Sequence, residues 1–202
     1  MGKLLRTAWP HGNACHGNDV TVAMFFHDGS SAFSAVVEDN RLKMWSVASG
    51  ICIKYFLHDC LYIDRVVLSS DGDTLLTAGC YGPIKSWDIS SGECIRTFWE
   101  DCHHEYATCV DLSPDGKFVI GIAIRGEAVL WKARTGKVSR RLQHPRHDLD
   151  WIFCVALSSD SQFALTGAGD GSVRIWNIIS GDCAGILRST SYRAVIAATF
   201  AP

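Results

Sequence analysis

The sequence predicts an all-β fold that repeats one four-stranded antiparallel unit four times. Tryptophans follow apolar residues at intervals of 42, 44 and 45 residues, at Trp45, Trp87, Trp131 and Trp176. Five residues after each comes a glycine that is preceded by Ser or Thr. An Asp-Gly or Asp-Ser pair stands 16 or 17 residues before each tryptophan. Agreement at three separate anchors indicates a tandem repeat.

Each repeat divides into four short strands joined by Asp, Gly and Ser turns. No helical period persists for ten residues anywhere in the chain. In the last unit the expected strands are Ile152–Leu157, Phe163–Thr166, Val173–Trp176 and Cys183–Leu187. Short strands with these turns predict an antiparallel meander. A repeated meander of this length is typical of a β-propeller blade.

The anchors place four full blades between two fragments. The expected blades are residues 15–58, 59–101, 102–144 and 145–190. Within residues 1–14, Gly2–Thr7 resembles Gly92–Thr97 and Gly136–Arg141, so it is interpreted as the outer strand of an incomplete blade. Within residues 191–202, Val195–Phe200 is similar to the first strand of a further blade. We expect an open arc, as part of a longer propeller or a truncated product. A small closed ring of four blades is the alternative.

Nearly all of the chain resembles the WD (Trp-Asp) repeat family, although only Trp87-Asp88 keeps the name-giving pair. The resemblance implies a hydrogen-bond network of His, Ser/Thr, Asp and Trp in each blade. Its members here would be His16, Asp39, Trp45, Thr77, Trp87, His103, Trp131, His147, Thr166, Asp170 and Trp176.

Three of the four networks depart from this pattern. The first unit has Ala35 at the Ser/Thr position, and the second has Tyr81 at the Asp position, with His58 one residue early. The third unit has Gly121 and Arg125 at the Ser/Thr and Asp positions. Because a half-satisfied buried network is weak, we expect the fourth unit to be the most tightly ordered.

Composition excludes several classes of protein. The 202 residues carry a formal net charge of −2, with 20% charged and 48% hydrophobic residues, which favours one globular body. No basic run exceeds two residues and no apolar run approaches a membrane span, so no nucleic-acid or membrane partner is expected. The nine cysteines include no CxxC pair, and the start lacks the apolar stretch of a secretory signal. We therefore expect reduced thiols in a cytoplasmic protein, and a nuclear location is also compatible.

No cluster of reactive side chains forms a catalytic or metal motif. The densest groups, His58-Asp59-Cys60 and Cys102-His103-His104, have no second pair with which to complete a zinc site. Adjacent strand residues do not aim at one another as a nucleophile and its base would. Gly167–Gly171 leads into a strand, so it is a hairpin and not a phosphate loop. We predict no enzyme activity, no metal and no cofactor.

One strand position suggests a binding site. Nine residues before the turn aspartates stand Asp19, Tyr62, Tyr106 and Trp151, and Asp64 lies close by. In the resembled family, this position lies at a rim of the central channel where partner peptides dock. The predicted function is a protein-interaction scaffold whose partner presents a basic residue, with self-association through open blade edges. The alternative function is a regulatory or sensor segment of a larger multidomain protein or enzyme whose catalytic part is absent from this chain. The alternative role of the aromatic residues is packing between blades.

Overall fold

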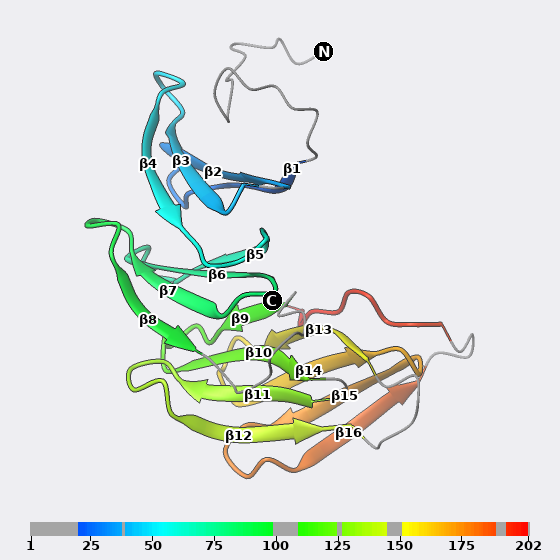
Figure 1. Cartoon of the computed structure of the whole chain (residues 1–202). Coiled ribbons are helices and arrows are strands. Elements are labelled where there is room, and N and C mark those ends of the chain that lie inside the picture. The colour runs from blue at the N-terminus through cyan, green and yellow to red at the C-terminus, as the bar shows by residue number, and fades with distance from the viewer. Residues whose placement is uncertain are drawn as a thin grey trace.

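The computed structural model describes residues 20–37, 39–98, 109–124, 127–144, 151–188 and 193–201, of which the backbone alone is described at 123–124. In these residues the chain forms sixteen strands and no helix (Figure 1). The strands make four separate four-stranded antiparallel sheets, each in simple sequence order. The predicted all-β fold of four-stranded blades is confirmed.

Each sheet lies within one of the predicted blade ranges and is named here by its order in the chain. Blade 1 consists of β1 (Val20–Phe25), β2 (Ser31–Val36), β3 (Arg41–Ser46) and β4 (Cys52–Leu57). Blade 2 consists of β5 (Tyr62–Leu68), β6 (Thr74–Cys80), β7 (Ile84–Asp88) and β8 (Cys94–Phe98). Blade 3 consists of β9 (Val110–Leu112), β10 (Phe118–Ile124), β11 (Glu127–Lys132) and β12 (Val138–Gln143). Blade 4 consists of β13 (Ile152–Leu157), β14 (Phe163–Ala168), β15 (Ser172–Asn177) and β16 (Cys183–Arg188).

The first strand of each blade contacts the first strand of the next, so β1, β5, β9 and β13 form the inner side of the arc. Side chains of these strands bond across the junctions. Thr21 donates to the Ile63 carbonyl at 2.6 Å, and the Asp111 carboxylate accepts the Leu157 amide at 2.7 Å. Neighbouring blades are therefore held together along the inner strands.

The first turn of blades 2, 3 and 4 is built by one recurring device. A serine hydroxyl donates to the turn aspartate, as Ser113 does to Asp115 at 2.7 Å. The same hydroxyl accepts the amide that starts the next strand, at 2.9 Å for Phe118. These bonds explain why the Asp-Gly and Asp-Ser pairs mark strand ends so reliably.

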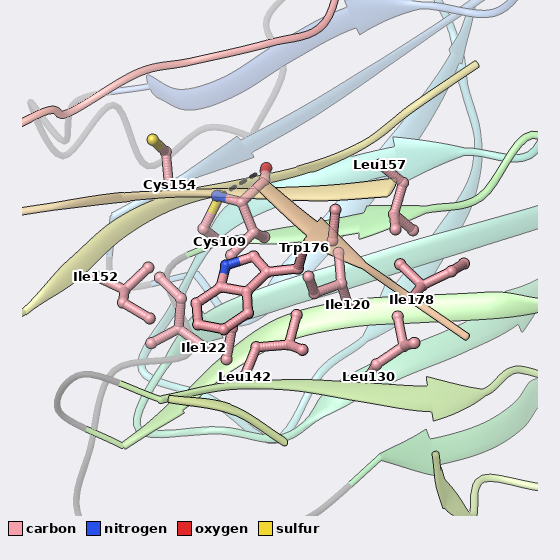
Figure 2. Close-up of a cluster of buried hydrophobic side chains, with 13 residues drawn as sticks. Cys109, Ile120, Ile122, Leu130, Leu142, Ile152, Cys154, Leu157, Trp176 and Ile178 are labelled. Carbon is pink, nitrogen blue, oxygen red and sulfur yellow. Dashed lines mark hydrogen bonds between the residues drawn. The ribbon is translucent and has the colours of Figure 1, made fainter. Parts of the chain in front are cut away.

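The hydrophobic core lies between blades. Figure 2 shows Trp176 of blade 4 surrounded by apolar side chains that include Ile122 and Leu142 of blade 3. A second cluster joins blades 2 and 3 around Trp131, and a third joins blades 1 and 2 around Trp87. Each of these tryptophans faces the preceding blade and is at most 5% exposed.

The four sheets do not close into a ring (Figure 1). No strand is assigned to residues 193–201, so the strand expected at Val195–Phe200 is not formed. The segment still lies against blade 4, because the Val195 amide donates to the Ala168 carbonyl at 3.0 Å. Val195 and Ala198 also pack on the core that contains Trp176.

Candidate functional site

A tryptophan-to-hydroxyl bond is shared by blades 1, 2 and 4. The indole Nε1 donates to Ser34 Oγ in blade 1 at 2.9 Å, to Thr77 Oγ1 in blade 2 at 2.8 Å, and to Thr166 Oγ1 in blade 4 at 2.9 Å. The assignment of Ala35 to this position was wrong, since Ser34 is the acceptor. Ser34 stands eleven positions before its tryptophan, whereas the threonines of blades 2 and 4 stand ten positions before theirs.

Blade 4 has the most extended network. His144 Nε2 lies 2.6 Å from Thr166 Oγ1, so this buried hydroxyl meets both the histidine and Trp176. Asp170 accepts the amide and the hydroxyl of Ser172 at 2.8 and 2.6 Å. Burial acts to raise the pKa of Asp170, but the bonds from Ser172 and the charges of His144 and Arg174 outweigh it and lower that pKa.

The histidine of this network comes from an unexpected place. We predicted His147, which lies outside the described residues, as do His16 and His103. The structure instead places His144 against Trp176, directly after the last strand of blade 3. Blade 4 therefore takes this group from the end of the strand that precedes it.

In blade 2 the histidine position is filled but its ring lacks partners. His58 follows β4 as His144 follows β12, and its ring lies 6.3 Å from that of Trp87. The side chain is fully buried, and neither ring nitrogen has a hydrogen-bond partner. Burial, assisted by the charge of Lys85, lowers the pKa of His58 to about 4. The ring is therefore neutral near pH 7.

An ion pair occupies blade 2 where the network carboxylate is missing. The Lys85 Nζ lies 2.6 Å from Asp59 Oδ2 and 5.4 Å from the centre of the Trp87 ring. In blade 1, Asp39 pairs with Lys43 at 3.6 Å and with Arg41 at 3.0 Å. Lys43 and Lys85 both stand two residues before their tryptophans, so an ion-paired lysine recurs at this position in the two blades.

Blade 3 has no hydroxyl at the acceptor position. Gly121 pairs with Val129 there, as Thr166 pairs with Arg174 in blade 4. A Cβ atom at Gly121 would lie only 2.3 Å from Ile84 Cδ1 of blade 2. Apolar packing from the neighbouring blade thus takes the place of a hydrogen bond beside Trp131. Arg125, predicted at the Asp position, lies outside the described residues.

Two of the predicted rim aromatics are described. Tyr62 begins β5 and Trp151 directly precedes β13, and both are half-buried. Asp64 has one carboxylate oxygen that is buried without a hydrogen-bond partner, and burial raises the pKa of this side chain. Asp19 and Tyr106 lie outside the described residues.

Two further side chains lie at the same end of blade 2. Leu61 and Tyr81 are 55% and 50% exposed, and the Leu61 amide donates to the carbonyl of Cys80, beside Tyr81. Tyr81 has a φ of 58°, a left-handed conformation that is unfavourable for a residue with a Cβ atom. We did not predict either residue. The available signal was Tyr81 itself, a tyrosine where the resembled family has an aspartate.

The buried cysteines are poor nucleophiles. Burial raises the pKa of the Cys60 thiol to about 12 and also raises the pKa of Cys80, Cys109 and Cys154. Raised pKa values leave the thiols protonated near pH 7. Among the described residues, no three His, Cys, Asp or Glu side chains gather as a metal site. The same part of the chain contains no helix that is long and apolar enough to cross a membrane.

Known proteins share these repeats. The family model "WD domain, G-beta repeat" matches residues 92–131 and 137–177. The chain is 32% identical over 66 residues to Protein ROOT INITIATION DEFECTIVE 3 of Arabidopsis thaliana, covering 32% of this chain and 14% of that protein. It is 38% identical over 63 residues to Periodic tryptophan protein 2 of Arabidopsis thaliana, covering 31% and 7%. It is 29% identical over 76 residues to WD repeat-containing protein 1 of Xenopus tropicalis, covering 38% and 12%.

Tandem four-stranded blades with buried tryptophans define a protein of the β-propeller class. The matches above show WD repeats within residues 92–177, and the chain is similar to WD-repeat proteins. That family is in general a non-catalytic scaffold for protein interactions. The chain spans at most 14% of the length of the three relatives.

Proposed function

We propose that the chain binds a protein or peptide through a rim formed by Tyr62, Tyr106 and Trp151, flanked by Asp19 and Asp64, and that Leu61 and Tyr81 extend this rim over blade 2. The observation that carries the proposal is the exposed pair Leu61 and Tyr81 beside the half-buried Tyr62. Large amphipathic rings that bury apolar area and still hydrogen-bond are typical of interface hot spots.

The carboxylates support a partner with a basic residue. The unpaired oxygen of Asp64 lacks a hydrogen-bond donor. A Lys or Arg side chain of the partner near this carboxylate would lower its raised pKa through charge attraction. Asp59 is 74% exposed at its side chain, although it already pairs with Lys85. Charge complementarity of this kind selects the partner and accelerates its association more than it adds affinity.

Peptide display on the purified chain tests this function. A library with random residues around a fixed Lys should return peptides that pair the Lys with apolar residues, and Tyr81→Ala should weaken their binding at least about tenfold. A matched control is Tyr55→Ala, because Tyr55 is also exposed but lies on the outer strand β4. If both variants bind the selected peptides like the parent chain, the rim is not the binding site.

Self-association is a second proposal, and blade 4 is the blade that favours it. The outer strand β16 exposes Ile186 and Leu187 by 46% and 60%. Exposed apolar strands at a sheet edge invite pairing with another copy. Light scattering during gel filtration should show dimers of the parent chain, and Leu187→Lys should shift them to monomers. Monomers of 22.2 kDa for both chains would contradict this proposal.

The alternative of a regulatory segment within a larger enzyme is not favoured by the similar proteins. Their shared feature is the repeat itself.

A further inference from the structure

Three blade junctions share a basic side chain that reaches the next blade. Lys54 donates to the carbonyls of Ile89 and Ser90 at 2.7 and 2.5 Å. Arg96 donates to the carbonyls of Arg134 and Thr135 at 2.7 and 3.3 Å. Arg140 donates to the carbonyl of Ile179. We call these three contacts the latches. In all three, one acceptor is the third residue after the tryptophan of the next blade.

The stem of each latch residue lies on a turn glycine. A Cβ atom at Gly92, Gly136 or Gly181 would come within 3.1, 3.0 or 3.0 Å of the side chain of Lys54, Arg96 or Arg140, respectively. All three glycines have positive φ, between 70° and 85°. The Ser/Thr-Gly pair is therefore both the turn of one blade and the seat for the side chain of the blade before it.

An apolar side chain accompanies each latch and covers the tryptophan of the next blade. Two residues after the latch stand Phe56, Phe98 and Leu142, which are 1%, 3% and 0% exposed. The ring of Phe56 lies 5.8 Å from that of Trp87, and Phe98 lies 6.0 Å from Trp131. Leu142 belongs to the cluster around Trp176. A junction thus consists of a latch, a seat and a cover.

The two ends of the array differ in these parts. At the far end, blade 4 has Gly185 at the latch position, and its cover residue Leu187 is 60% exposed. At the near end, blade 1 has a complete seat, since Gly50 has a φ of 70° and no described atom within 4 Å of its Cβ position. Trp45 on this face is half-buried, whereas the other three tryptophans are at most 5% exposed.

We propose that the N-terminal segment Gly2–Thr7 of this chain docks on blade 1, with Arg6 as a fourth latch that donates to the carbonyl of Ala48. Arg6 stands four positions after Gly2, as Lys54 stands four after Gly50 and Arg96 four after Gly92. Ala48 is the third residue after Trp45, which is the acceptor position that all three latches share. Residues 2–7 themselves lie outside the described part of the chain.

A second copy is a poorer occupant of this seat. Head-to-tail association would bring blade 4 of one copy onto blade 1 of another. Blade 4 presents Gly185, which has no side chain to donate. The segment Gly2–Thr7 supplies the missing guanidinium from the same chain, so its docking does not depend on protein concentration.

Hydrogen exchange of the full-length chain tests the proposal. Arg6→Ala should speed exchange of the amides over residues 46–51 about fivefold, the factor expected for one partly exposed charge-assisted contact. Arg6→Lys should restore the protection, because Lys54 forms its latch with a lysine. Lys3→Ala is the matched control, since Lys3 precedes the latch position by three residues and should change nothing.

Two results would overturn the proposal. One is that Arg6→Ala leaves hydrogen exchange over residues 46–51 unchanged. The positive control for this result is Arg140→Ala, which should speed exchange at the Ile179 turn and so show that the method detects a lost latch. The other is protection of blade 1 that rises with protein concentration and ignores Arg6→Ala, which would identify a second copy as the occupant. Neither readout depends on the rim, so the proposed function and this docking can fail separately.

Discussion

Blades 2 and 4 surround their buried tryptophans with different polar and charged side chains. Both join the indole to a threonine hydroxyl and place a histidine from the preceding strand end beside the ring. Blade 4 then has Asp170, and its histidine reaches the threonine at 2.6 Å. Blade 2 has Tyr81 instead, and its histidine is neutral and without hydrogen bonds. The two blades thus differ both at the carboxylate position and in whether the histidine bonds to the threonine.

The comparison also shows what blade 2 gains. Without a network carboxylate, Lys85 pairs with Asp59 and lies over the indole. Tyr81 takes a strained backbone conformation and exposes its ring at the rim. Strained residues often persist where they serve binding. On the proposed function, blade 4 is arranged for stability and blade 2 for contact with a partner.

The largest expected effect is the loss of the threonine hydroxyl in blade 4. Thr166→Val leaves both Trp176 and His144 without their shared partner, so the free energy of unfolding should fall by about 2–4 kcal/mol. Thr77→Val removes the hydrogen-bond acceptor of Trp87 alone, so the free energy of unfolding should fall by about 1–2 kcal/mol. Urea denaturation of both variants measures the difference. Equal losses would show that His144 contributes nothing to the network.

Acid should destabilise blade 2 through His58. Its pKa is about 4 in the folded chain, against 6.5 for a free histidine. The unfolded chain therefore binds more protons between these values, and stability is full above about pH 6.5 and declines as the pH falls toward 4. The expected loss is about 2–3 kcal/mol. His58→Phe should remove this part of the pH dependence in chemical denaturation, and an unchanged pH profile would contradict the buried neutral state.

Removing the carboxylate of blade 4 should cost less than removing its threonine. Asp170→Ala leaves the amide and hydroxyl of Ser172 without their acceptor, at roughly 1–3 kcal/mol. Tyr81→Ala should not carry that penalty, because blade 2 has no carboxylate at this position. Equal shifts of the two urea midpoints would remove the distinction between the blades.

The smallest expected effect on stability comes from relieving Tyr81. Tyr81→Gly suits the positive φ at this position, so the chain should keep its stability or gain up to about 1 kcal/mol. The same change should remove the contribution of the Tyr81 ring to peptide binding. Unfolding curves and peptide titrations of one sample separate the two effects. A large loss of stability would mean that the tyrosine ring is structural.

The repeat, the strands and the turns were predictable because their signals are local. An Asp-Gly turn and an alternating strand each depend on a few neighbouring residues, as the serine–aspartate bonds at Asp115 show. The network was harder to predict. Ser34 was missed because the spacing to Trp45 is one residue longer than in blades 2 and 4. His144 was missed because the residue belongs to the end of one blade and acts in the next.

The rim was predicted only in part, for a related reason. Tyr62 and Trp151 share a repeat position, which sequence spacing can detect. Leu61 and Tyr81 come together only when β5 pairs with β6, and only the left-handed backbone at Tyr81 sets its ring apart from ordinary strand residues. Exposure of a side chain at a loop depends on the packing of several strands and not on its neighbours in the sequence.

The central claim is that the rim aromatics bind a partner and do not merely pack between blades. The most direct measurement is the affinity of Trp151→Ala and Tyr106→Ala for a display-selected peptide, taken together with their melting temperatures. We predict that Trp151→Ala weakens binding by roughly 2 kcal/mol or more and that its melting temperature stays close to that of the parent chain. Sharply lower melting temperatures, with unchanged affinity of the folded protein, would show that these rings are interior packing and would contradict the account.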